Sequence, residues 1–254
     1  MNSNKENINR ARVLFYGLFA SLFAFVLEEK RYNELEKKIE FFLQNPIDES
    51  MDKTLKNMSQ IISSKGLKSI ESEFDAIFYD LSGSPVPTTA SFYEEERDDG
   101  KKRQLMVNYV LQSNYRRDNK KFTDLEDDIG FIFAIMQNLI VDELDGDEKA
   151  AFLESEVFKN VLNPFVDEFI ENIYMNENAL FYQEAAILLK SFISLERLFL
   201  NVNRPKEREK VSQKEQPVNI SDVEAKRRLE NKRKKSQEIQ ECIIEAGGDV
   251  EDEV

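Results

Sequence analysis

Apolar residues recur every three or four positions along most of this chain, which is the spacing of one face of an α-helix. The segment 129–144 shows the pattern most strongly and reads IGFIFAIMQNLIVDEL. No segment alternates between apolar and polar residues as a strand would. Further helices are predicted at 13–27, 31–45, 48–64, 67–81, 101–118, 147–162, 164–175 and 178–202. The pattern predicts an all-α protein whose residues 1–203 form a single compact helical domain.

The first apolar segment, 13–27, reads VLFYGLFASLFAFVL and follows Arg10 and Arg12. Basic residues before an apolar run are typical of a signal peptide, but Glu6 lies among them and no small-residue cleavage site follows. The run is also short for a membrane span, which needs about 20 residues. We therefore expect a central buried helix and a cytoplasmic protein without stable membrane insertion.

The chain changes character after residue 203. Pro205 and Pro217 lie in a charged stretch with few apolar residues, which is typical of a disordered linker. Ser221 can cap a short charged helix at about 222–246. Residues 204–254 are therefore predicted to form a charged, partly disordered tail outside the helical domain.

The amino-acid composition limits the catalytic and metal sites that this chain can form. The chain has no histidine and one cysteine, Cys242. Histidine zinc sites, Glu-x-x-His di-iron sites and Ser-His-Asp triads are therefore excluded, and so is an internal disulfide. No glycine-rich nucleotide-binding motif occurs. These absences favour a protein that is not an enzyme and carries no cofactor.

The formal net charge of the whole chain is −14, and residues 1–203 carry most of it. An acidic body disfavours nucleic acid and anionic membranes as partners. It favours a basic partner, through an attraction that salt screens.

One loop interrupts the helical pattern. Residues 78–93 read FYDLSGSPVPTTASFY, with Pro85 and Pro87 between aromatic pairs at both ends. The two prolines stiffen the backbone, and a stiff loop loses little entropy when it binds a partner. The same features suit a rigid surface connection whose flanking aromatic residues belong to the core. Both interpretations stay open on this evidence.

A dense acidic group, Glu126-Asp127-Asp128, precedes the helix at 129–144. Thr123 and Glu126 have the spacing of a capping box that would open this helix. Such acids could bind Mg²⁺ or act as an acid–base pair, or they could simply stabilise the positive end of the helix dipole. Adjacent helical residues point about 100° apart, so the three side chains cannot all converge on one ion.

The order of these features resembles the TorD/DmsD/NarJ family of cytoplasmic redox-enzyme maturation chaperones. The motifs that carry the resemblance are FDAIFYDLSG at 74–83, ASFY at 90–93 and LEDDIGFIFAIMQNL at 125–139. Two positions depart from the family pattern. Asp128 stands where the family has a histidine, and residues 88–90 stand where several members have a tryptophan.

The resemblance implies a peptide-binding face on this loop and the start of the following helix. In chain order, the predicted peptide-binding residues are Tyr79, Leu81, Gly83, Pro87, Ser91, Tyr93, Glu126, Asp127, Asp128 and Gly130. A signal peptide with paired arginines and an apolar stretch needs carboxylates beside an apolar groove, and these residues offer both.

The resemblance also implies a function. The family binds the twin-arginine signal peptide and the immature catalytic subunit of a molybdenum-dependent oxidoreductase, assists cofactor insertion and delays export. Formate dehydrogenase, a sulfoxide or N-oxide reductase and nitrate reductase are all compatible clients. The alternatives are an all-helical Mg²⁺-dependent enzyme using residues 126–128, and a scaffold that forms a homodimer through residues 221–246.

Overall fold

The computed structural model describes residues 3–24, 31–45, 48–79, 85–118 and 122–206. The chain divides into two units, Met1–Lys206 and Glu207–Val254. The predicted helix at 222–246 and most of the predicted linker lie outside the described residues.

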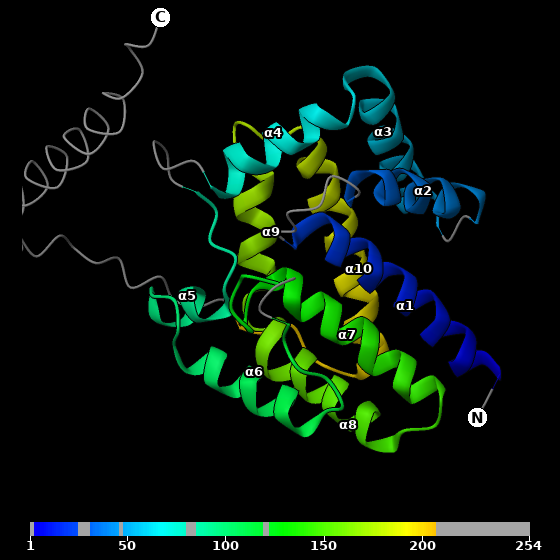
Figure 1. The fold of residues 1–254 in the computed structure, drawn as a ribbon. Coiled ribbons are helices and arrows are strands. Elements are labelled where there is room, and N and C mark those ends of the chain that lie inside the picture. The colour runs from blue at the N-terminus through cyan, green and yellow to red at the C-terminus, as the bar shows by residue number, and fades with distance from the viewer. Residues whose placement is uncertain (1–2, 25–30, 46–47, 80–84, 119–121, 207–254) are drawn as a thin grey trace, which may run out of the picture. The chain divides into compact units, whose positions relative to one another are not determined.

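The described part of the chain is helical and contains no strand, so the all-α prediction is confirmed (Figure 1). In chain order, the elements are α1 (Ser3–Phe23), α2 (Arg31–Gln44), α3 (Glu49–Lys65), α4 (Leu67–Phe78), α5 (Ala90–Glu95), α6 (Lys101–Gln112), α7 (Ile129–Leu144), α8 (Glu148–Val157), the π-helical turn η1 (Phe158–Leu162), α9 (Val166–Tyr174) and α10 (Phe181–Leu200).

Several boundaries follow from local chemistry. The Asp48 carboxylate accepts the N–H groups of Ser50 and Met51 and begins α3, while Gly66, at a φ of 76°, ends it. α6 is shorter than predicted because Arg116 donates to the carbonyl of Val110 and so satisfies the end of the helix. The short helix α5 was not predicted.

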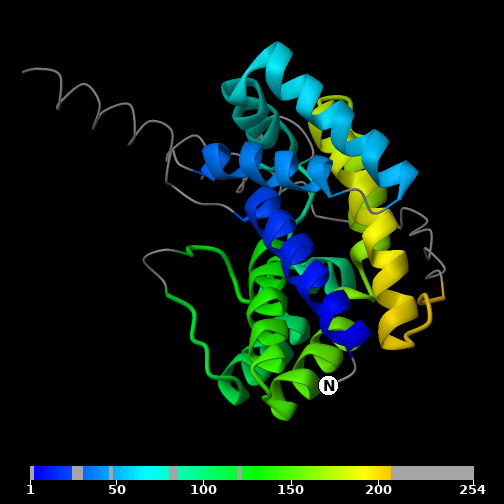
Figure 2. The same cartoon turned by 90° about the vertical axis from the view of Figure 1, so that its right-hand side faces the viewer.

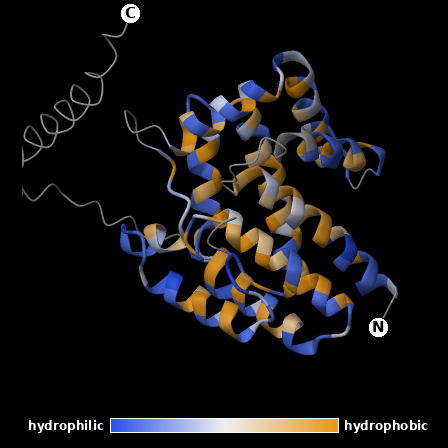
Figure 3. Ribbon diagram, viewed as in Figure 1, coloured by the Kyte–Doolittle hydropathy of each residue, from blue (hydrophilic) through white to orange (hydrophobic). Residues whose placement is uncertain are grey.

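α1 is the central helix of the core, as the sequence predicted, and it begins ten residues earlier than expected. α7 runs beside it in both views (Figures 1 and 2). The Phe19 ring lies 5.6 Å from that of Phe133 on α7 and 5.3 Å from that of Phe192 on α10. Burial of such aromatic side chains dominates the energetics of a core. Apolar residues accordingly gather where the helices meet (Figure 3).

A buried ion cluster joins α1 to α8 and α10. Arg12 donates to both carboxylate oxygens of Glu196, at 2.6 and 2.8 Å, and also to Glu154. The Tyr16 hydroxyl donates to Glu196 at 2.8 Å. Burial raises the pKa of Glu154 to about 7, although the Arg12 charge opposes the shift. Removing either partner of such a buried pair leaves an uncompensated charge, so the cluster fixes how these helices meet.

The end of α4 is held by the aromatic core. The Phe78 ring lies 6.2 Å from Phe169 on α9 and 5.6 Å from Tyr182 on α10. The residues that follow α4 therefore start from a fixed point.

Gly130 lets the first turn of α7 touch the end of α1. A Cβ atom at this position would lie 2.4 Å from the Ala24 Cα and 2.5 Å from the Ala24 nitrogen. These are backbone atoms, so the clash cannot be relieved by a side-chain rotation. Gly17 faces the same crossing from α1, but its Cβ would meet only the end of the Gln137 side chain, at 2.6 Å.

We predict that Gly130→Ala lowers the free energy of unfolding by about 1–3 kcal/mol, the usual cost of overpacking against atoms that cannot move aside. Gly17→Ala is the matched control. The flexible Gln137 can shift, and alanine gains about 1 kcal/mol of helix propensity over glycine. Urea unfolding followed by circular dichroism measures both. Equal stability of the two variants would contradict the close approach of α1 and α7.

Candidate functional site: an acidic and aromatic cavity

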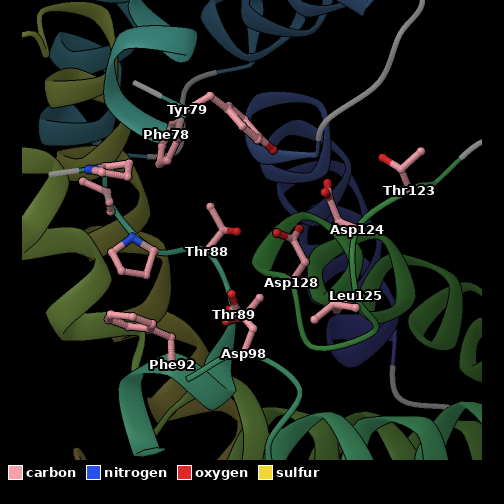
Figure 4. A pocket seen from close by; sticks show the side chains of 13 residues that line it. Phe78, Tyr79, Thr88, Thr89, Phe92, Asp98, Thr123, Asp124, Leu125 and Asp128 are labelled. Carbon is pink, nitrogen blue, oxygen red and sulfur yellow. Dashed lines mark hydrogen bonds between the residues drawn. The ribbon is translucent and has the colours of Figure 1, made fainter. Parts of the chain in front are cut away.

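A cavity of about 680 Å³ lies between the segment that follows α4 and the segment that precedes α7. Phe78 and Phe92 lie on one side of it, and Asp124 and Asp128 lie on the other (Figure 4). Thr89 and Asp98 lie between the two sides. The remaining lining residues are Tyr79, Pro85, Val86, Pro87, Thr88, Thr123 and Leu125.

Backbone hydrogen bonds join the two walls. The Ala90 N–H donates to the Asp127 carbonyl, and the Ile129 N–H donates to the Thr88 carbonyl, both at 2.9 Å. Thr89 and Asp128 form an isolated antiparallel bridge. The predicted loop and the predicted acidic group, well separated in sequence, therefore meet at one site.

Asp128 begins α7 and faces the cavity. Its carboxylate accepts the N–H of Gly130 at 2.8 Å and that of Phe131 at 3.4 Å, and the Thr88 hydroxyl also donates to it. The residue is 2% exposed. Burial raises its pKa to about 7, with a further contribution from the nearby charge of Asp124. A carboxyl group at this position changes charge near neutral pH.

Asp127 faces away from the cavity and is fully buried. It accepts the backbone N–H of Ser91 at 2.8 Å, in the first turn of α5. The Ser91 hydroxyl oxygen in turn accepts the N–H of Arg103, in the first turn of α6. Burial raises the pKa of Asp127, and the hydrogen bonds from Ser91 oppose that shift. Asp127 and Ser91 therefore hold α5 and α6 in place behind the cavity wall.

Glu126 does not cap a helix, and the predicted capping box is wrong. Its carboxylate lies 2.8 Å from the Arg103 Nε and 3.0 Å from the Arg117 Nε. Burial alone would raise its pKa, but the hydrogen bond from Arg103 and the two positive charges outweigh burial and lower it. The helix begins after Asp128 instead, because Asp128 supplies the capping carboxylate.

The aromatic residues of the predicted face differ in accessibility. Tyr79 is 41% exposed and Phe92 is 37% exposed. Tyr93 is half-buried; its ring lies 5.2 Å from that of Phe165, and its hydroxyl donates to the Pro87 carbonyl at 2.9 Å. Tyr93 therefore fixes the proline loop, while Tyr79 and Phe92 are accessible. Leu81 and Gly83 lie outside the described residues.

Residues 44–171, about half of the chain, match the family model described as nitrate reductase delta subunit. The chain belongs to this family of NarJ- and TorD-type chaperones. The resemblance given by the sequence motifs is thereby confirmed. Every residue that lines the cavity falls within the matched range.

The family is one of redox-enzyme maturation chaperones and is not catalytic. The three acids once considered for Mg²⁺ point to three different sets of partners, namely two arginines, α5 and α7. Within the described ranges, no group of three or more acidic or cysteine side chains is arranged to hold a metal ion. No helix in the part of the chain that the structure describes is long and apolar enough to cross a membrane.

Two acidic residues of the cavity were not predicted from the sequence. Asp98 lies in the turn between α5 and α6 and accepts the Thr89 hydroxyl at 2.6 Å. Asp124 precedes the bridge and raises the pKa of Asp128. Both residues sit in charged stretches that resemble ordinary solvent-exposed turns. The one feature of the sequence that points to these two residues is that they lie close, along the chain, to the motifs typical of the chaperone family.

We predict that the stability of the wild-type protein falls as pH rises from about 5 to about 7. The pKa of Asp128 is higher in the folded state than in the unfolded state, so its stabilising contribution is complete at low pH and is lost as the carboxyl group ionises. The loss amounts to at most about 1.4 kcal/mol per pH unit. Asp128→Asn keeps a capping side chain and should remove this part of the slope.

Urea unfolding at several pH values tests this prediction. The quantity to compare is the difference in the free energy of unfolding between Asp128→Asn and wild type. The contribution of Glu154 cancels in this difference, because both proteins contain it. Asp48→Asn is the matched control, because Asp48 caps α3 in the same way at an exposed position. Parallel stability curves for wild type and Asp128→Asn would contradict the assignment.

Proposed function

We propose that this chain is a cytoplasmic maturation chaperone that binds the twin-arginine signal peptide of a molybdenum-dependent oxidoreductase in the cavity between α4 and α7. It also holds the immature catalytic subunit, assists cofactor insertion and delays export. The observation that carries the proposal is the composition of the cavity, three aspartates facing exposed aromatic and proline residues, in a protein of this chaperone family.

The acidic side suits guanidinium groups. Asp98, Asp124 and Asp128 are the acidic residues among those that line the cavity. A carboxylate and a guanidinium form charge-assisted hydrogen bonds in a planar geometry that an ammonium group cannot reproduce. Each such contact contributes about 1.5–3 kcal/mol to the binding free energy.

The other side suits an apolar segment. Tyr79, Pro87 and Phe92 present aromatic and aliphatic surface to the cavity. Hydrogen bonds hold this wall before any ligand arrives, since Val86 donates to the Ile77 carbonyl at 2.8 Å and Tyr93 holds Pro87. A preformed wall loses little entropy on binding.

The predicted site residues therefore divide by role in this proposal. Tyr79, Pro87 and Asp128 would contact the peptide, together with Phe92, Asp98 and Asp124. The buried residues Ser91, Asp127 and Gly130 would hold the walls in position, as would Tyr93 through Pro87. Glu126 would act in the same way through its pairing with Arg103 and Arg117.

The proposal predicts tight binding of a synthetic, N-acetylated peptide that carries two adjacent arginines followed by an apolar stretch. Replacing both arginines by glutamine should abolish binding, and replacing them by lysine should weaken it. The double variant Asp98→Asn with Asp124→Asn should bind at least about tenfold more weakly, because it removes two charge-assisted contacts. Isothermal titration calorimetry gives the affinities.

Glu40→Gln is the control for this experiment, since it removes one exposed acidic charge on α2 outside the cavity. Phe92→Ala tests the apolar side separately. Equal affinity for the arginine and glutamine peptides would refute the proposed function, as would an equal loss in the Glu40→Gln control. Replacing Asp127 and Asp128 by alanine would be a poor test, because both carboxylates hold helix ends.

A further inference from the structure

Asp128 is a buried acid at the cavity wall whose hydrogen-bond partners are neutral. Two are backbone N–H groups of α7 and the third is the Thr88 hydroxyl. No lysine or arginine is among the described residues that line the cavity. A buried carboxylate without a counter-charge is costly, so the neutral acid is favoured while the cavity is empty of cations.

The charged groups around Asp128 reinforce this preference. Asp124 precedes it in the same segment, Asp98 faces the cavity from the turn between α5 and α6, and the Tyr79 phenol faces it from the end of α4. The nearest segment of the chain also holds Glu126, but Arg103 and Arg117 lie against that carboxylate. Both arginines are thus already paired with Glu126, and Arg103 also pairs with Asp99.

A guanidinium entering the cavity would provide the missing counter-charge. Two backbone N–H groups and the Thr88 hydroxyl already donate to Asp128 and suit a carboxylate, so only the positive charge is lacking. Adding the charge would favour the ionised form of Asp128 over the neutral form. The acid would then lose its proton as the ligand binds.

We propose that the cavity binds a cationic peptide together with release of the proton from Asp128, so that binding becomes tighter as pH rises through neutrality. This inference rests on the proposed function. In the step, the neutral carboxyl group and the peptide guanidinium become an ion pair, and the proton passes to water. Asp128, whose pKa burial raises to about 7, supplies the titrating group.

The chain is well suited to a test because it has no histidine, so no imidazole titrates near neutrality. The same N-acetylated arginine peptide has no group that titrates in this range. Calorimetric titrations at pH 7 in two buffers of different ionisation enthalpy give the number of protons released. We expect about half a proton per peptide at pH 7, and affinity about tenfold higher at pH 8 than at pH 6.

Two variants separate Asp128 from other groups. Asp128→Asn keeps the helix cap, should release no proton and should bind with the same affinity at pH 6 and pH 8. Asp124→Asn removes the neighbouring negative charge and should move the midpoint of the pH dependence to lower pH. Glu154→Gln, in the ion cluster of α1, α8 and α10, should leave the proton release unchanged.

The outcomes distinguish this inference from the proposed function. Peptide binding with identical heats in the two buffers would overturn proton release and leave the proposed function standing. Equal proton release by wild type and Asp128→Asn would overturn the assignment to Asp128. A complete lack of binding of the arginine peptide at pH 6, 7 and 8 would overturn both.

Discussion

Two adjacent carboxylates, Asp127 and Asp128, hold the walls of the candidate site together. The Asp127 side chain accepts an N–H group of α5, and the Asp128 side chain begins α7. The backbone between them bridges to the proline loop. Burying a carboxylate is costly, and here otherwise unpaired N–H groups at two helix ends offset part of that cost. Residues 127–128 therefore hold the starts of α5 and α7 in place beside the cavity.

The same arrangement links stability to binding. Asp128 is neutral at moderately acid pH because it is buried beside another acid, and its own contribution to stability is then the largest. Ionisation costs stability unless a cation arrives. In the mode of binding proposed above, a paired-arginine peptide supplies this cation, and its binding is coupled to the release of the proton from Asp128. Elsewhere in the core Glu154 is also a buried acid, and the Arg12 guanidinium offsets only part of the cost of its burial.

The helices were predictable because their apolar spacing is regular, as the matching bounds of α7 show. The contacts of the site could not be predicted, because they depend on residues that folding brings together. Glu126 was expected to cap a helix, yet Arg103 and Arg117 lie against it from a separate helix and the turn that follows it. Asp98 and Asp124 reach the cavity only because α5 and the bridge place them there. Helix propensity depends on residues that are close in sequence, whereas charge pairing depends on residues that folding brings close in space.

We propose that client peptides bind between the proline loop and the segment before α7. Hydrogen–deuterium exchange with and without the paired-arginine peptide tests it most directly, because it locates binding without any substitution. Protection should concentrate in residues 85–93 and 122–131, with little change in α2 and α3. Protection centred on α2, or on the small hollow beside Leu14 and Phe41, with none at the bridge, would contradict the account.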